Sequence, residues 1–224
     1  MPAADIVPTL LTCASPDVRD PLLLLADATG KLYLSPQEGE QWQALTTPWP
    51  GSGLLHLCVS PTDRTHQTLY ALTVQAAADA SYLMQIWQTT DGGNTWRTLA
   101  DFHADTPAAT MTLPLDPVEE PLLIGVGNRL IKLYRKPDDL TWAVAQNFLT
   151  DTRRITSIVT MANYLEDRNI FVTTNDGLYQ TEDGGATWTP VAAALAGRTL
   201  VAFLPGAAGM PAYAVELGGA IWQR

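Results

Sequence analysis

Two eight-residue segments combine an acidic residue with paired glycines, the residue types that could bind a cation or a phosphate group. They read TTDGGNTW at 89–96 and TEDGGATW at 181–188. A calcium loop of the EF-hand type needs oxygen ligands at alternate positions and a closing glutamate, but the residues after each aspartate, GGNTWRTL and GGATWTPV, contain no carboxylate. A phosphate-binding loop opens a helix and carries a lysine or arginine among its donors, whereas strand-forming residues follow here. A tight turn is therefore favoured over a metal or phosphate site.

Other residues with catalytic or metal-binding potential form no recognisable pattern. The histidines His56, His66 and His103 lack a paired spacing. His56 and Cys58 lie two residues apart on one expected strand, where two metal ligands are possible but a packed core pair is favoured. Cys13 and Cys58 are interpreted as small buried apolar residues. No nucleophile-elbow, Walker or dinucleotide motif occurs, so we expect no cofactor, no metal and no enzyme activity. The 23 acidic residues still leave the carboxylate pair of a glycosidase open.

Charge and composition restrict the classes of partner. The net charge is -10, which argues against nucleic acid and against anionic membranes, because binding to either depends largely on basic side chains. The N-terminus lacks the basic region of a signal peptide, and no apolar run is long enough to span a bilayer. Two cysteines do not suggest a disulfide framework. The expected location is cytoplasmic.

A repeat indicates which elements position these residues. A short apolar strand with an aromatic residue recurs at intervals of 54, 47, 45 and 43 residues, at Tyr33, Trp87, Tyr134, Tyr179 and Trp222. A tryptophan follows each of the first four after 8 or 9 residues, at Trp42, Trp96, Trp142 and Trp188. Two further strand-like runs, rich in Leu, Val, Ile and Thr, precede each aromatic residue. Four short strands in every repeat are typical of a β-propeller.

The predicted fold is all-β, a five-bladed β-propeller of four-stranded antiparallel blades in one domain, residues 1–224. The blades are expected at about 9–46, 53–100, 108–147, 153–194 and 198–224 plus 3–7. The N-terminal segment AADIV is expected to supply the outer strand of the fifth blade and close the ring, which removes an unpaired edge. An open fragment completed by another chain is the alternative. The longest interval predicts extra residues in the second blade, in a hairpin around QAAADASY.

The two quoted segments match the Ser/Thr-x-Asp-x-Gly-x-Thr-Trp pattern, and the chain therefore resembles Asp-box, or BNR-repeat, propellers such as sialidases, sortilin-type receptors and photosystem II assembly factors. Degenerate copies read SPQEGEQW at 35–42 and KPDDLTW at 136–142. The resemblance implies a turn between the third and fourth strands of a blade. The carboxylates of Asp91 and Asp183 would accept backbone hydrogen bonds, Gly93 and Gly185 would adopt positive φ, and the tryptophans would pack between sheets. The structural residues so implied are Thr89, Asp91, Gly93, Thr95, Trp96, Thr181, Asp183, Gly185, Thr187 and Trp188.

Catalysis of the sialidase kind is not implied, because fold does not carry function. The Arg-Ile-Pro motif of those enzymes is absent, and the nearest match, RRIT at 153–156, lies in another part of the chain.

The resemblance implies that ligands meet the face opposite the Asp-box turns. On that face we name Trp49, Asp79, Tyr82, Arg153 and Arg154 as candidate binding residues. Trp49 lies between two prolines and is either a binding residue or a lid over a neighbouring core, and the arginine pair is either a binding element or a solvated loop. The predicted function is a non-catalytic module, bacterial in style, that binds another protein or acts as a scaffold. A carbohydrate-binding or glycoside-hydrolysing propeller is the alternative, and the sequence predicts no oligomeric state.

Overall fold

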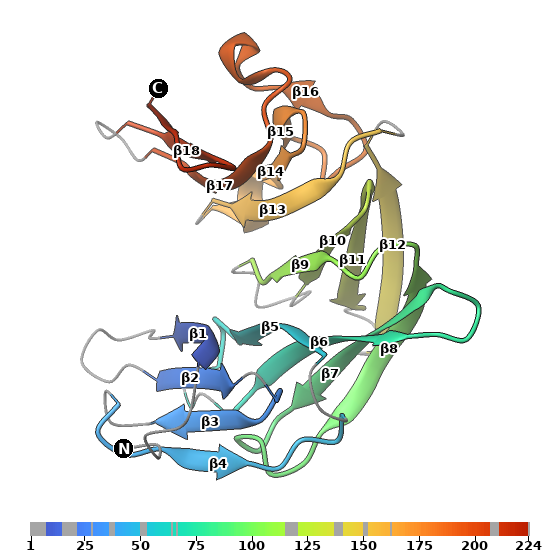
Figure 1. Cartoon of the computed structure of the whole chain (residues 1–224), viewed down its shortest axis with the longest axis vertical. Coiled ribbons are helices and arrows are strands. Elements are labelled where there is room, and N and C mark those ends of the chain that lie inside the picture. Colours follow the sequence, from blue (N-terminus) through green and yellow to red (C-terminus); the bar gives the residue numbers. More distant parts are fainter. Residues whose placement is uncertain are drawn as a thin grey trace. The chain divides into compact units, whose positions relative to one another are not determined.

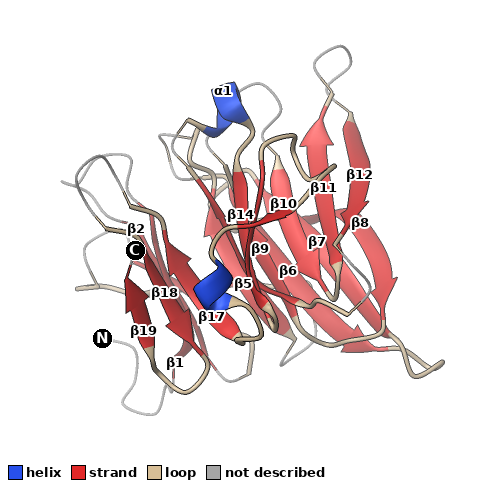
Figure 2. Cartoon of the chain, turned by 90° about the horizontal axis from the view of Figure 1, so that it is seen from above, coloured by secondary structure: helices blue, strands red, loops and turns tan. Residues whose placement is uncertain are grey.

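The computed structural model describes the backbone of residues 8–14 and, with side chains, residues 22–27, 29–35, 39–49, 53–63, 65, 67–114, 121–136, 141–149, 152–161, 163–206 and 211–223. Nearly all of the regular structure in these ranges is β-strand, and the helices are two short turns (Figure 2). The chain divides into two compact units, Met1–Pro107 and Ala108–Arg224.

The first unit contains two four-stranded antiparallel sheets, each with its strands in chain order (Figure 1). One sheet comprises β1 (Pro8–Ala14), β2 (Leu22–Asp27), β3 (Leu32–Ser35) and β4 (Gln43–Leu45). The other comprises β5 (Leu54–Val59), β6 (Leu69–Ala76), β7 (Tyr82–Thr89) and β8 (Arg97–Ala104).

The second unit contains three antiparallel sheets, again in chain order. The first comprises β9 (Ala109–Thr112), β10 (Leu122–Val126), β11 (Arg129–Arg135) and β12 (Trp142–Phe148). The next comprises β13 (Ile155–Thr160), β14 (Ile170–Thr174), β15 (Gly177–Thr181) and β16 (Thr189–Pro190), with the helix α1 (Tyr164–Asp167) between β13 and β14. The last comprises β17 (Leu200–Leu204), β18 (Tyr213–Glu216) and β19 (Ile221–Gln223), and follows the 3-10 helix η1 (Ala193–Leu195).

Five antiparallel sheets, one for each sequence repeat, make the chain a five-bladed β-propeller, which confirms the predicted fold class. Four of the sheets have four strands, and the fifth has three among the described residues. The expected fourth strand of that sheet, in residues 3–7, lies outside the described part of the chain. Closure of the ring by this segment therefore stays a prediction.

The second sheet has the long hairpin that the sequence interval predicts. Strands β6 and β7 pair from Leu69 with Thr89 to Ala76 with Tyr82, and the turn between them spans residues 77–81. The backbone N–H of Ala77 donates to the carbonyl of Ser81 at 2.8 Å. The extra residues thus lengthen both strands rather than forming an irregular loop.

Apolar side chains are buried where neighbouring sheets of one unit face each other. In the first unit the two sheets share a cluster that includes Leu24, Leu45 and Leu69. In the second unit one cluster joins the sheet β9–β12 to the sheet β13–β16, and another joins β13–β16 to β17–β19. Burial of this apolar area is the main stabilising contribution to the fold, and it fixes the position of the aromatic residues discussed below.

Candidate functional site

The first of the two DGG turns, between β7 and β8, is held by a network of hydrogen bonds around Asp91. The carboxylate of Asp91 accepts from the backbone N–H of Thr95 at 2.9 Å, from the hydroxyl of Thr95 at 2.6 Å and from the hydroxyl of Thr89 at 2.7 Å. The hydroxyl oxygen of Thr89 in turn accepts from the N–H of Gly93 at 3.0 Å. These contacts are those expected of an Asx-type turn.

The second turn, between β15 and β16, repeats this network. The carboxylate of Asp183 accepts from the N–H of Thr187 at 2.9 Å and from its hydroxyl and that of Thr181 at 2.6 Å each. The hydrogen bond from the Thr95 hydroxyl contributes most to lowering the pKa of Asp91 to about 2, and the bond from the Thr181 hydroxyl contributes most to lowering the pKa of Asp183 below its usual range. Both carboxylates are ionised at neutral pH and interact with their own turns.

The second glycine of each turn could not be replaced without strain. Gly93 has φ 91° and Gly185 has φ 104°. A Cβ on Gly93 would lie 2.7 Å from Cδ1 of Leu45, and one on Gly185 would lie 2.9 Å from Nδ2 of Asn147. The turns therefore sit tightly against the fourth strand of the preceding sheet, which supplies Leu45 in one unit and Asn147 in the other.

The tryptophan after each turn packs into the core between two sheets. Trp96 lies against the cluster of the first unit, and Trp188 lies against the cluster that joins β9–β12 to β13–β16. The indole N–H of each is buried and has no hydrogen-bond partner among the described residues. Both tryptophans are thus placed as packing elements rather than as part of a surface.

Trp49 is buried, with 5 % of its surface exposed. Its ring contacts that of Trp96 edge-on, with centroids 5.1 Å apart, and lies 5.8 Å from that of Trp87. The indole N–H donates to the carbonyl of Gly30 at 3.4 Å. This geometry favours the lid over a core, the alternative interpretation of Trp49, because a buried ring offers no surface for a partner to stack on.

Asp79 and Tyr82 lie on the long hairpin of the second sheet. The carboxylate of Asp79 accepts from the backbone N–H of Ser81 at 3.1 Å and from its hydroxyl at 2.5 Å, and this hydroxyl is 2.8 Å from Nδ1 of His103. The bond from the Ser81 hydroxyl contributes most to lowering the pKa of the exposed Asp79. Tyr82 is half-buried and begins β7. A binding role of these two residues stays a prediction.

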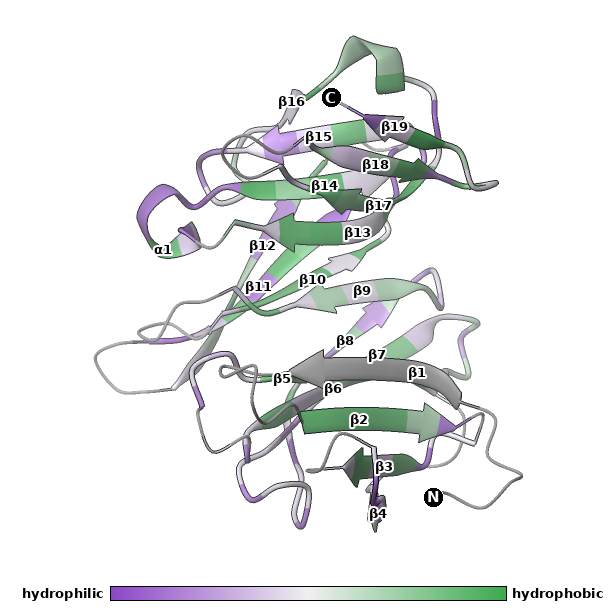
Figure 3. Ribbon diagram, turned by 90° about the vertical axis from the view of Figure 1, so that its left-hand side faces the viewer, coloured by the Kyte–Doolittle hydropathy of each residue, from purple (hydrophilic) through white to green (hydrophobic). Residues whose placement is uncertain are grey.

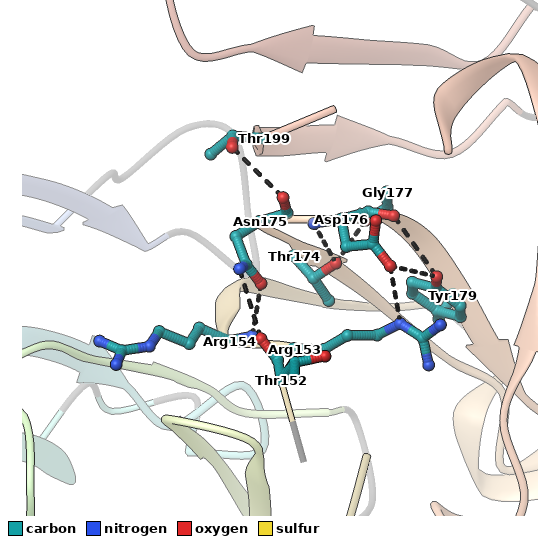
Figure 4. Close-up of polar contacts among 9 residues, drawn as sticks. All are labelled: Thr152, Arg153, Arg154, Thr174, Asn175, Asp176, Gly177, Tyr179 and Thr199. Atoms are coloured by element: carbon teal, nitrogen blue, oxygen red, sulfur yellow. Dashed lines mark hydrogen bonds and ion pairs between the residues drawn. The ribbon is translucent and has the colours of Figure 1, made fainter. Parts of the chain in front are cut away.

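Arg153 and Arg154 point in different directions from the loop before β13 (Figure 4). Arg153 forms an ion pair with Asp176 at 3.1 Å, and its guanidinium lies 4.4 Å from the ring centroid of Tyr179. The backbone N–H of Arg154 donates to Oδ1 of Asn175 at 2.6 Å, while its exposed side chain extends away from this cluster. The pair therefore does not form a two-armed anion clamp, since Arg153 is engaged within its own sheet.

The remaining candidates for chemistry do not converge. Cys58 is on β5, and desolvation raises the pKa of its thiol to about 12, which disfavours the thiolate. The side chains of Cys13 and His66 lie outside the described residues. Within the described ranges no group of three His, Cys, Asp or Glu side chains is arranged to hold a metal ion. No described helix is long and apolar enough to cross a membrane.

A cavity that the sequence did not indicate opens between the sheets β13–β16 and β17–β19 of the second unit. Its volume is about 600 Å³, within the roughly 300–1,000 Å³ of typical ligand sites. Phe171 and Phe203, whose ring centroids are 5.2 Å apart, line the cavity, and Leu195 and Trp222 contribute further apolar surface. In Figure 3 the ribbon of β14 and of the short helix after β16 is coloured mostly hydrophobic, and these elements supply Phe171 and Leu195 to the lining.

One wall of the cavity is rigidly held. The indole N–H of Trp222 donates to the carboxylate of Glu216 at 3.1 Å, and the guanidinium of Arg198 lies 4.0 Å from the ring centroid of Trp222. Arg198 and Glu216 also form an ion pair at 3.1 Å. These contacts fix the orientation of the indole in the cavity wall.

Exposed apolar side chains gather around the same sheet. The large apolar residues that are most exposed within the described ranges are Val144, Phe148, Leu165, Val201, Leu204, Tyr213, Leu217 and Ile221. The last five belong to the sheet β17–β19 or its hairpin, and Ile221 is 69 % exposed. Exposed apolar patches of this kind mark sites where a protein, a membrane or a ligand binds.

Comparisons with known proteins show the fold and no closer relationship. No family model and no curated protein matches the chain. Among solved structures, YCF48 from Cyanidioschyzon merolae matches with a TM-score of 0.57 and 15 % identity over 100 % of this chain and 70 % of that one.

Two further structures cover smaller shares of their own chains. The extracellular domain of the hybrid two-component system BT4673 from B. thetaiotaomicron matches with a TM-score of 0.65 and 12 % identity, over 99 % of this chain and 27 % of that one. BBS1N in complex with ARL6DN matches with a TM-score of 0.57 and 13 % identity, over 97 % of this chain and 65 % of that one. These neighbours are β-propellers, and at such low identity the likeness shows the fold alone.

Proposed function

We propose that this propeller is a non-catalytic module that binds another protein, as a scaffold or assembly factor, through the sheet β17–β19 and the cavity beside it. The observation that carries the proposal is the apolar cavity of about 600 Å³ next to the exposed side chains of Leu204, Tyr213 and Ile221. Large exposed apolar surfaces on soluble proteins usually mark contacts with other proteins. The similar structure of BBS1N was solved in complex with ARL6DN, which supports a protein partner for a fold of this kind.

The DGG turns belong to the structural part of the proposal. We infer that both are Asp-box turns, because each joins the third and fourth strands of its sheet and each uses its aspartate, threonines and second glycine in the same hydrogen bonds. In this proposal their task is folding, and the partner binds elsewhere. A cytoplasmic location in a bacterial cell is a further part of the proposal, which fractionation of the native host tests.

The experiment compares partner capture by three forms of the purified chain from an extract of the native host. The site variant is Tyr213→Ser with Ile221→Ser, and the matched control is Val144→Ser with Phe148→Ser, which removes comparably exposed apolar groups from β12. We expect one protein to be retained by the wild type and by the control, and to be lost with the site variant. Capture that is equal for all three forms would contradict the proposed surface.

A parallel assay addresses catalysis. The chain is incubated with a panel of chromogenic glycosides and applied to a glycan array, and no turnover and no saturable binding are expected. Turnover that one Asp or Glu substitution abolishes would overturn the non-catalytic proposal and support the glycoside-hydrolysing alternative.

A further inference from the structure

The cavity occupies a position that a tryptophan fills in the two other cores described above. In the first unit, Trp96 contacts Trp49 edge-on and packs against the cluster that contains Leu45, and Trp87 packs against the same cluster. Leu45 and Trp49 lie three and seven residues after Trp42 in the sequence, and Val191 and Leu195 lie three and seven residues after Trp188. These last two residues line the cavity. The equivalent residues therefore form a packing site in one unit and an open cavity in the other.

The third strands of the second and fifth sheets, β7 and β19, also carry equivalent residues. Trp87 in the segment IWQ of β7 corresponds to Trp222 in the segment IWQ of β19, and Trp222 also lines the cavity. Trp96 immediately precedes the fourth strand, β8. Among the described residues, no equivalent of Trp96 reaches the cavity, because the fifth sheet has three strands.

The outer edge of β19 has backbone groups directed away from its sheet. In the other four sheets the third strand pairs with a fourth, as β7 does with β8. The backbone N–H of Glu216 donates to the carbonyl of Ala220 at 2.8 Å. Since hydrogen-bonded pairs alternate along an antiparallel ladder, Ala214 and Trp222 form the next one. The backbone groups of Ile221 therefore face the outer edge of β19, which pairs with no strand among the described residues; this edge is called the open edge below.

The first unit also indicates which residue would follow the tryptophan on a fourth strand added to the edge of β19. Gln88 lies opposite Arg97 in the ladder of β7 and β8, and the Gln88 side-chain oxygen accepts from the Arg97 guanidinium at 2.6 Å and 3.0 Å. Gln223 holds the position of Gln88 on β19. A net charge of -10 likewise favours a basic residue on the incoming strand.

We propose that a partner protein adds an extended segment to the edge of β19, places a tryptophan or similarly large aromatic side chain in the cavity, and pairs a basic residue after it with Gln223. In this mode of recognition backbone hydrogen bonds give affinity and the pocket for the side chain gives specificity. The mode is continuous with the core between β13–β16 and β17–β19, whose cluster of Leu178, Leu195 and Ala214 the aromatic side chain would extend. The inference rests on the proposed function, since it names the chemistry by which the partner binds that surface.

The test uses peptides copied from this chain. The probe is fluorescein-labelled NTWRTLA, residues 94–100, which contains Trp96 and the first four residues of the corresponding strand, β8, of the second sheet. Control peptides are NTARTLA, without the anchor, and NTWETLA, with the charge reversed. Fluorescence anisotropy against the whole purified chain should show saturable binding of the probe. The affinity of NTARTLA should be weaker by roughly ten-fold or more, as for loss of an interface anchor, and NTWETLA should also bind more weakly than the probe, because it lacks the basic partner of Gln223.

Protein variants separate strand addition from filling of the cavity. Ile221→Pro removes an N–H from the open edge, and Ile221→Ala is the matched control that keeps it; circular dichroism confirms that both are folded. Both variants lose the Ile221 side chain, so we expect Ile221→Pro to bind the probe roughly ten-fold more weakly than Ile221→Ala does, because only in Ile221→Pro does an added strand lose a ladder hydrogen bond. Equal binding to both variants would overturn strand addition and leave an apolar pocket for a small molecule or side chain.

Two further outcomes would overturn the proposal. No binding of NTWRTLA to the full chain, together with binding after deletion of residues 1–7, would show that the site is filled by the chain's own N-terminal segment. No binding of the probe to the full chain or to the chain without residues 1–7 would refute the proposal that an aromatic side chain of a partner fills the cavity. Partner capture that depends on Tyr213 and Ile221 would still support the proposed function in that case, so the two failures are distinguishable.

Discussion

Substitution of the two neighbouring glycines in the second DGG turn separates backbone strain from steric exclusion. Gly184 has φ 70° and Gly185 has φ 104°, so alanine at either position is forced into the left-handed region, at about 1–2 kcal/mol. A Cβ on Gly184 meets nothing within 4 Å, whereas a Cβ on Gly185 would lie 2.9 Å from Nδ2 of Asn147 and 3.0 Å from Cδ2 of Leu130. Overpacking of this kind costs about 1–3 kcal/mol.

We therefore expect Gly184→Ala to lower the free energy of unfolding by about 1–2 kcal/mol and Gly185→Ala by about 2–5 kcal/mol, the sum of strain and overpacking. Urea denaturation followed by far-UV circular dichroism measures both. Leu130 is buried and Asn147 donates to the carbonyl of Gly184, so neither neighbour moves without cost. Equal destabilisation by the two substitutions would refute the close packing of this turn on the preceding sheet.

Three further predictions concern stability. Trp49→Ala should lower the free energy of unfolding by about 3–5 kcal/mol, since a buried aromatic is lost; unchanged stability in denaturant titrations would show that the ring is not a core residue. The folded-state pKa of Asp91 is lowered from 3.8 to about 2, so its contribution is full above pH 4 and is lost as the pH falls through about 2; Asp91→Asn should flatten the fall in melting temperature over this window, and a parallel profile would argue against the carboxylate network. Arg153→Ala should change stability by about 1 kcal/mol or less, because its ion pair with Asp176 is partly exposed; a loss of several kcal/mol in calorimetry would show that the pair is far stronger than its exposure allows.

The fold followed from the sequence because the aromatic residue recurs in all five blades, and the first four blades place a tryptophan 8 or 9 residues after it. The 54-residue interval also located the lengthened hairpin, since strands β6 and β7 absorb the additional residues. The DGG turns could also be predicted from the sequence, because a short acidic side chain followed by glycines has few conformations that satisfy its hydrogen bonds. Local chemistry and periodicity were therefore sufficient to predict the architecture.

Burial of Trp49 was harder to predict, because the flanking prolines suggest an exposed loop. The signal lay in the repeat: Trp49, Leu149 and Leu195 each lie seven residues after a tryptophan, and all three are buried. The cavity could not be predicted in this way. It exists because one expected aromatic side chain is lacking among the described residues, and its walls come from segments that are distant in sequence, such as Phe171 and Trp222.

The most direct test of the account places a photoreactive residue at the proposed surface. p-Benzoylphenylalanine is incorporated in place of Tyr213, which lines the cavity and is 37 % exposed, or in place of Phe148 on β12 as the control. Cells of the native host are irradiated, and cross-linked peptides are identified by mass spectrometry. The account predicts that position 213, and not position 148, cross-links to one partner protein at a segment that contains a tryptophan or another large aromatic residue. Cross-links from position 213 only to this chain itself, or to no protein, would contradict it.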